Sequence, residues 1–261
     1  MKKTLILSLL AFLPVAVPAA HASDLGLATS TYDWSGAYAG INLGGVRSDM
    51  QSERETRYVG ASALPQDLQE LVDDADNRMS THDTGFTGGV SAGYNWQYDQ
   101  MVFGLETDIS LMSLNGTMKR DVTGLFEDYY QTPGLKVTDN MNYSVDSFGT
   151  VRGRLGLAVD NILIYGTGGL AYGFVDAEAT VHGRDIVGEE RWRASNSEWT
   201  MGWTVGGGIE YGIDRWSIGA EMLYVDLSSI DMRSTRRGDF AAEWDAATSF
   251  AVLRATGKVR F

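Results

Sequence analysis

The sequence predicts an all-β fold, an eight-stranded antiparallel transmembrane β-barrel with short periplasmic turns and four long extracellular loops. Three observations predict it. Eight segments alternate between apolar and polar side chains, the connections between them alternate between long and short, and the last strand ends on an aromatic residue, Phe261. Transmembrane barrels combine such alternation with short turns at one end and longer loops at the other.

The last strand shows the alternation most clearly. From Ala251 to Phe261 the odd positions are small or apolar, whereas Arg254, Lys258 and Arg260 occupy even positions. Successive side chains of a strand point to opposite faces. One face can therefore contact lipid while the other carries charge, which is typical of a barrel strand.

Seven earlier segments alternate in the same way, and each covers about ten residues, the length that a tilted strand needs to cross a bilayer. Their apolar faces lie within 37–43, 86–96, 101–109, 151–157, 162–174, 199–211 and 216–224. Aromatic residues lie near the ends of these faces, as interfacial girdles require. The predicted girdle comprises Tyr94, Trp96, Tyr172, Trp199, Tyr211, Trp216 and Tyr224.

The connections alternate in length along the whole chain. The long ones are 46–83, 111–147, 175–198 and 228–248, and the short ones are 97–100, Asp160 and 213–215. Leu64–Asn77 in the first loop has apolar residues at helical spacing, so an amphipathic helix and a mobile acidic loop both fit. A secreted β-sandwich has similar strand patterning and is the alternative fold. The aromatic girdle, the alternating loop lengths and the terminal aromatic residue favour the barrel.

The first residues predict export. Lys2 and Lys3 precede an apolar run over 5–17, and Ala20-His21-Ala22 has the small-x-small pattern of a cleavage site. We therefore predict a signal peptide over 1–22, cleaved after Ala22, then a periplasmic lead over 23–34 and the barrel over 35–261. The apolar run is too short, and too interrupted by proline, for a good transmembrane helix.

The composition narrows the function classes. The chain has 21 basic and 34 acidic residues and a formal net charge of −13, which argues against nucleic acid as a partner. It has no cysteine, so an exported fold must form without disulfides. The 31 glycines are scattered through apolar runs, where they make room in a narrow barrel.

The predicted inward faces carry the main group of chemically active side chains. An eight-stranded barrel is just wide enough for its side chains to fill it, so charges inside must pair. This favours an ionic core in place of a hydrophobic one, and the charged constriction of a narrow channel is the alternative. The predicted lumen network comprises Glu106, Asp108, Arg152, Arg154, Glu210, Glu221, Arg254, Lys258 and Arg260.

Other candidate sites are weaker. His82 and His182, with the loop tyrosines Tyr58, Tyr129 and Tyr130, have side chains that can ligate haem iron, but lone exposed histidines are usually only solvated. Without cysteine or an arranged carboxylate, two histidines make no convincing zinc site. No serine, histidine and acid arrangement is visible. We expect no metal site, no cofactor and no enzymatic activity.

The sequence also resembles a known family. Residues 32–44, YDWSGAYAGINLG, are similar to the opening of small alphaproteobacterial outer-membrane immunogenic proteins, porin-family β-barrels related to the outer-membrane protein A transmembrane domain. The segments 151–156, 164–173, 203–211 and 221–227 resemble later parts of that family. The resemblance spans nearly the whole mature chain and fails only in the loops. The first loop is long and acidic here, which departs from the family's pattern.

The resemblance implies an abundant outer-membrane protein, inserted by the barrel-assembly machinery through a terminal strand whose assembly signal would be Val259 and Phe261. Its expected partners are outer-membrane lipid and lipopolysaccharide, with a host molecule or haemin as a ligand of the loops. We expect a monomer that supports envelope integrity and surface interactions, with no solute-wide pore. A narrow, weakly selective channel and loop-mediated ligand binding are the alternative functions.

Overall fold

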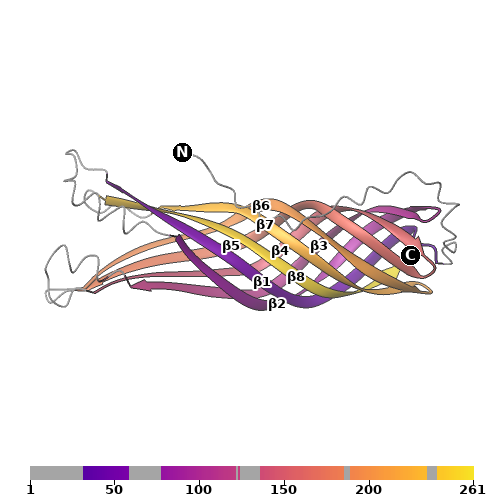
Figure 1. Ribbon diagram of the computed structural model, residues 1–261, viewed down its shortest axis with the longest axis horizontal. Coiled ribbons are helices and arrows are strands. Elements are labelled where there is room, and N and C mark those ends of the chain that lie inside the picture. The colour runs from indigo at the N-terminus through magenta and orange to yellow at the C-terminus, as the bar shows by residue number, and fades with distance from the viewer. Residues whose placement is uncertain (1–31, 59–77, 122, 124–135, 185–188, 234–239) are drawn as a thin grey trace.

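The computed structural model describes residues 32–58, 78–121, 123, 136–184, 189–233 and 240–261. Eight antiparallel strands form one closed barrel in sequence order, with β1 paired to both β2 and β8 (Figure 1). The predicted eight-stranded antiparallel barrel is therefore confirmed. The strands are β1 (Gly36–Tyr58), β2 (Arg78–Tyr98), β3 (Met101–Asp121), β4 (Lys136–Val159), β5 (Ile162–Arg184), β6 (Glu189–Ile213), β7 (Trp216–Arg233) and β8 (Phe240–Arg260).

One end of the barrel, the turn end, carries three two-residue turns, which join β2 to β3, β4 to β5 and β6 to β7. The first residue of each turn is an aspartate with positive φ: 52° at Asp99, 49° at Asp160 and 52° at Asp214. Aspartate tolerates this left-handed conformation better than most residues do. The predicted short turns are thus confirmed, and the C-terminus lies at the same end (Figure 1).

At the opposite end, the loop end, the strands are much longer than predicted. They span 18 residues in β7 and 25 in β6, against the expected ten or so. Most of the residues assigned to long loops therefore belong to strands, and that assignment was wrong. The strands are connected there by 59–77, 122–135, 185–188 and 234–239. The proposed helix over 64–77 and the signal peptide over 1–22 lie outside the described residues.

β3 shows why the strands were predicted to be too short. In its first half the outward side chains are apolar, as at Phe103 and Leu105, and the inward ones include Glu106. In its second half Leu114 points inward and Lys119 outward. The strand continues with the same inside and outside, but the polarity of its two faces is exchanged. A prediction that ends the strand where its outward face becomes polar therefore makes the strand too short.

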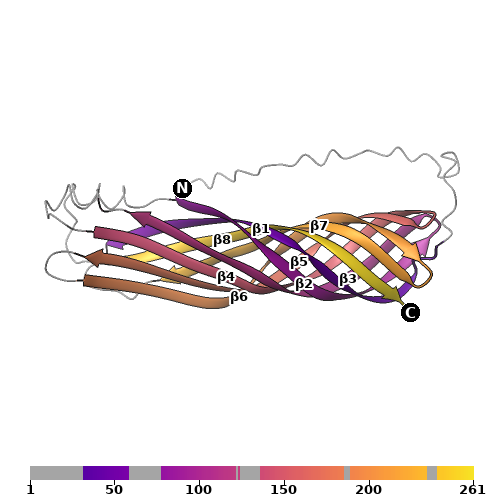
Figure 2. The ribbon, with the colours of Figure 1, turned by 90° about the horizontal axis from the view of Figure 1, so that it is seen from below.

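The interior of the loop-end half is a hydrophobic core, which we call the apolar layer. Its aromatic centre is Phe148 against Phe250, with ring centroids 5.2 Å apart at an interplanar angle of 76°. The strands run obliquely around the long axis past this layer and continue to the turn end (Figures 1 and 2). The layer comprises Val46, Met112, Leu114, Met118, Met141, Tyr143, Val145, Phe148, Ala171, Val175, Ala177, Ala179, Leu223, Val225, Leu227, Phe250 and Val252. Within the described ranges, no helix is long and apolar enough to cross a membrane.

Candidate functional site

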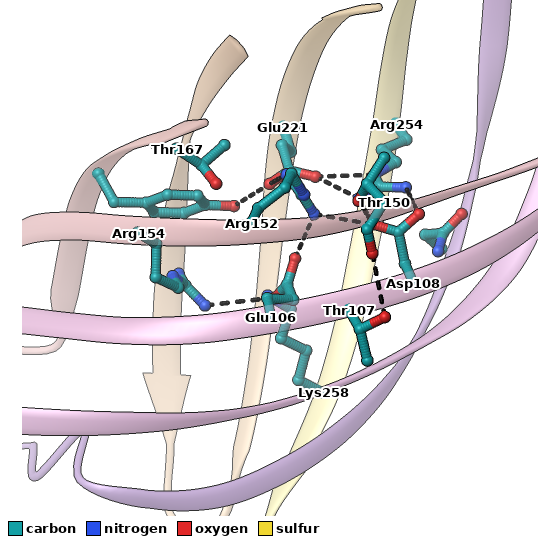
Figure 3. A network of polar contacts seen from close by, with 12 residues as sticks. Glu106, Thr107, Asp108, Thr150, Arg152, Arg154, Thr167, Glu221, Arg254 and Lys258 are labelled. Atoms are coloured by element: carbon teal, nitrogen blue, oxygen red, sulfur yellow. Dashed lines mark hydrogen bonds and ion pairs between the residues drawn. The ribbon is translucent and has the colours of Figure 1, made fainter. Parts of the chain in front are cut away.

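Between the apolar layer and the turn end, buried charges fill the barrel, and we call them the ionic layer. It contains four acids and four bases, contributed by β3, β4, β6, β7 and β8. Figure 3 shows all of them except Glu210. Each side chain is at most 5% exposed. Its members are Glu106, Asp108, Arg152, Arg154, Glu210, Glu221, Arg254 and Lys258.

Arg152 is the centre of this layer. Its Nη1 donates to Glu221 Oε1 at 2.9 Å, and its Nη2 donates to Asp108 Oδ2 at 3.0 Å and to Glu106 Oε1. One guanidinium therefore contacts three carboxylates that come from two strands, β3 and β7 (Figure 3). Arginine suits this position because its planar group presents five donors and keeps its charge.

Arg254 joins the same acids from β8. Its Nη2 lies 2.6 Å from Glu221 Oε2 and 3.3 Å from Asp108 Oδ2. The Thr150 hydroxyl donates to the same Asp108 oxygen at 2.5 Å. Each of these two carboxylates is thus shared between two guanidiniums, so no acid in this part of the layer is left without a counter-charge.

A second group lies nearer the turn end. Arg154 Nη2 donates to Glu210 Oε1 at 2.7 Å, and Lys258 Nζ lies 2.9 Å from that same oxygen. Lys258 Nζ also lies 2.5 Å from Glu106 Oε2, whose carboxylate contacts Arg152 through its other oxygen. Glu106 therefore links the two groups into one continuous network.

Tyrosines complete the hydrogen bonding of the layer. Tyr38 donates to Glu106 Oε2 at 2.8 Å, and Tyr165 donates to Glu221 Oε1 at 3.0 Å. Gly93, the partner of Tyr38 on β2, makes room for the first ring, because a Cβ there would lie 2.4 Å from it. The Arg154 guanidinium lies over the Tyr165 ring, 4.0 Å from its centroid. Hydrogen-bonded hydroxyls and ring faces replace the water that these charges lose.

Arg260, which the alternation placed in the network, lies outside it. Its guanidinium stacks on the Tyr32 ring, 4.6 Å from the centroid, at the turn end. No ion pair of Arg260 occurs among the described residues. The reason is its position in β8: it is the last strand residue, beyond Lys258, which already reaches Glu106 and Glu210.

Below the ionic layer, residues that precede β1 close the turn end. Tyr32 and Trp34, which the sequence assigned to the periplasmic lead, are 7% and 3% exposed, with ring centroids 4.5 Å apart. The Tyr32 hydroxyl donates to the Trp216 carbonyl at 3.2 Å, and the Trp34 amide donates to Gln97 Oε1 at 2.7 Å. We call the buried group here the mouth cluster: Tyr32, Trp34, Val102, Ala158, Leu163 and Tyr165.

A cavity of about 20 Å³ lies where the mouth cluster meets the ionic layer. Trp34, Tyr38 and Lys258 are among the residues that line it. This volume holds about one water molecule. The space is therefore suited to hydrating a buried charge and too small for a solute.

The predicted girdle residues all point outward from the barrel. Trp216 lies at the turn end of β7, and Tyr224 lies eight residues further along. At about 3.3 Å per residue and a tilt of about 40°, this separation is about 20 Å along the barrel axis, close to the height of an apolar belt in outer-membrane barrels. Glu221 lies between the two aromatics on the same strand, so the ionic layer lies at membrane depth.

The structure does not bring the two histidines together. His82 is on β2 and His182 on β5, with β3 and β4 between them. His82 Nε2 lies 2.7 Å from Asp49 Oδ1 on the exposed outer face. Tyr58 ends β1, and Tyr129 and Tyr130 lie outside the described residues. Among the described residues, no three histidine, aspartate or glutamate side chains are grouped so as to hold a metal ion.

Sequence reasoning missed the apolar layer and the mouth cluster. A signal for the first was present in β7, where Leu223, Val225 and Leu227 follow one another at the inward positions. Such a run argues against a polar lumen over that length. The mouth cluster had no comparable signal, because two aromatic residues before a strand show no strand periodicity.

A closed barrel with an apolar belt, aromatic girdles and an interior filled by paired charges defines a transmembrane β-barrel of the outer-membrane class. Residues 5–250 match the family described as outer membrane protein beta-barrel domain. The chain therefore belongs to this family and is an outer-membrane protein of the Gram-negative envelope.

Two relatives of known description are also outer-membrane proteins. The chain is 36% identical over 200 residues to the 31 kDa outer-membrane immunogenic protein of Brucella melitensis, covering 76% of this chain and 72% of the relative. It is 31% identical to a 22 kDa outer membrane protein of Rhizobium leguminosarum, covering 63% of each. OprG from Pseudomonas aeruginosa is a solved structure similar to it, with 14% identity, a TM-score of 0.49, and coverage of 87% of this chain and 97% of that one.

Proposed function

We propose that the chain is a structural, non-enzymatic outer-membrane barrel that is closed to solutes and supports the envelope and its surface contacts. The observation that carries this proposal is the ionic layer, in which four acids and four bases pair with one another and are almost fully buried. Charges that conduct ions must meet water along a continuous path. Here Arg152, at the centre, has a side chain of 0% exposure.

The neighbouring layers support closure. The mouth cluster lies on one side of the charges, with Trp34 3% exposed, and the apolar layer lies on the other, with Phe148 and Phe250 each 1% exposed. A solute would have to displace packed aromatic side chains at two levels and ion pairs between them. These packed layers support a barrel that is closed to solutes and stabilised from within.

The surface role rests on the loop end. There the strands carry polar outward side chains such as Asp49 and Lys119 beyond the apolar belt, which would hold the connections away from the membrane surface. Because closure leaves no free strand edge in the spanning part, the barrel needs no partner subunit, and we propose a monomer. The Brucella relative's description as immunogenic favours surface exposure of the same end here.

Planar-bilayer conductance of the folded mature protein tests closure. Folding is first established from the mobility of unboiled protein on a gel, and a general porin reconstituted in the same membranes shows that the assay detects openings. We expect no discrete openings from folded protein, because no continuous water path crosses three packed layers.

Discrete and reproducible openings would overturn the proposal. If the conductance also changed in Arg152→Gln but not in Lys119→Gln, the lumen would be a narrow, charge-lined channel. Lys119 is the matched control because it is a cation on the outer face of β3, away from the lumen.

A further inference from the structure

The outer face of β8, β1 and β2 is hollowed near the loop-end limit of the apolar belt. The hollow has a volume of about 660 Å³, and we call it the outer groove. One row of paired residues crosses it: Met222 opposite Leu253, Leu253 opposite Gly45, and Gly45 opposite Phe86. Leu253, Phe86 and Met222 are 65%, 80% and 56% exposed, so the row presents apolar surface to lipid.

Gly45 is the reason for the hollow. It lies between Leu253 and Phe86 without a side chain, and a Cβ built there would meet nothing nearer than the Gly85 carbonyl oxygen at 3.9 Å. The space above this glycine is therefore open and bounded by two large apolar side chains. A hydrocarbon chain fits such a surface because burying apolar area is favourable and requires no polar partner.

The next row toward the loop end contains polar side chains. Arg47 lies opposite Ala251 on one side and Thr84 on the other, and both partners line the outer groove. Ser113 and Asn115 on β3 also line it and also point outward. The groove thus joins an apolar floor to a rim with one cation and three hydrogen-bonding side chains.

Arg47 makes no side-chain hydrogen bond or ion pair among the described residues. Asp49, two residues further along the same outer face, is instead bonded to His82 at 2.7 Å. Arg47 is the first charged residue on the outward face of β1, after the apolar or small positions 37–45. It therefore lies where the apolar belt ends and the headgroups of the outer leaflet begin.

We propose that the outer groove binds a phosphorylated glycolipid of the outer leaflet. One acyl chain lies against Gly45, Phe86 and Leu253, and a phosphate is bound by Arg47. A guanidinium is the side chain best suited to phosphate, which it can contact through two parallel hydrogen bonds. The site is on the lipid face of the barrel, so it goes beyond the proposed closed lumen and does not depend on it.

The test measures binding of lipid A to the folded mature protein in non-ionic detergent by native mass spectrometry. Three probes are compared: intact lipid A, the same lipid A after removal of its phosphates, and phosphatidylethanolamine. We expect intact lipid A to bind most tightly. Arg47→Gln should weaken it about tenfold, the effect of losing a charge-assisted contact, and should leave binding of the dephosphorylated lipid unchanged.

Gly45→Leu fills the groove and should weaken binding of both forms of lipid A. The backbone tolerates a side chain there, and Gly45→Ala is a smaller change with the same expected direction. Lys119→Gln, a loss of charge on the same end but outside the groove, is the matched control and should bind lipid A normally.

Unchanged binding in Arg47→Gln would overturn the proposal. So would equal affinity of the wild-type protein for intact and dephosphorylated lipid A, or equal affinity for phosphatidylethanolamine. Unchanged binding in both folded Gly45 variants would show that the groove is not where the acyl chain lies and would also overturn it.

Discussion

The two halves of the barrel interior are filled by side chains of opposite polarity. In the half at membrane depth the interior is ionic, with Arg152 bonded to three carboxylates, whereas in the loop-end half it is apolar, with Phe148 packed on Phe250. The difference follows what surrounds each half. Lipid outside requires an apolar outer face, which leaves the polar residues inside, and water outside reverses this arrangement.

The stability of the two halves should therefore respond differently to substitution. Removing one charge from the ionic layer leaves one uncompensated charge buried among the remaining partners, and this costs more stability than the intact ion pair contributes. Removing an aromatic side chain from the apolar layer creates a cavity, and the loss can stay local because the side chains of this layer pack mainly on one another.

The largest effect is expected for Arg152→Met. This change removes the cation that Glu106, Asp108 and Glu221 share. Arg254 and Lys258 still contact these acids, but one buried negative charge is left uncompensated, and we expect the free energy of unfolding to fall by about 4 kcal/mol. The measurement is a urea titration of protein folded in lipid vesicles. Arg152→Lys, which keeps the charge but loses the fork of donors, should lie between this variant and the wild type. Wild-type stability in Arg152→Met would contradict an ionic core that stabilises the barrel.

A smaller effect, about 3 kcal/mol, is expected for Phe250→Ala in the apolar layer, from the transfer of the lost ring and the cavity that it leaves. Hydrogen exchange should rise around Phe148 and Val225, which pack in the same layer, while amides beside Arg152 keep their protection. Leu253→Ala, on the lipid face of the same strand, is the control. Equal loss of protection in both halves would show that the barrel unfolds as one unit. It would contradict a difference in local stability between the ionic and the apolar half.

The smallest effect is expected for the pair between His82 and Asp49, because their side chains are 58% and 54% exposed. We expect His82→Ala to change the free energy of unfolding by no more than about 0.5 kcal/mol, since water screens exposed pairs. The same titration measures it, and a loss approaching that of Arg152→Met would mean that burial is not what separates strong from weak pairs in this protein.

Much of the fold was predictable from local pattern. Alternation located all eight strands, and Asp160 was correctly placed in a tight turn. The strand ends at the loop end were not predicted, because each strand was taken to end where its outward face became polar. In β3 the pattern continues from Met112 through Lys119 with its polarity exchanged, so attention to both faces together would have extended it.

The candidate site was likewise predicted in part. Eight of the nine charges assigned to the lumen from the sequence lie in the ionic layer, because facing inward is a local property of alternate positions. Arg260 does not, because Tyr32 lies against it at the turn end. Nothing in the strand periodicity predicts how a segment before β1 packs.

The sequence by itself determined the eight strands in order and the side of the sheet on which their residues lie, because both follow from short-range alternation and turn residues. It indicated the compartment through the export signal and the aromatic end of the last strand. Only the tertiary structure decided which charges pair. Glu106 and Lys258 are 152 residues apart in the chain, and they meet at 2.5 Å only because β1 closes the barrel against β8 in one register. That register is set by closure of the whole sheet, a constraint that no single strand contains.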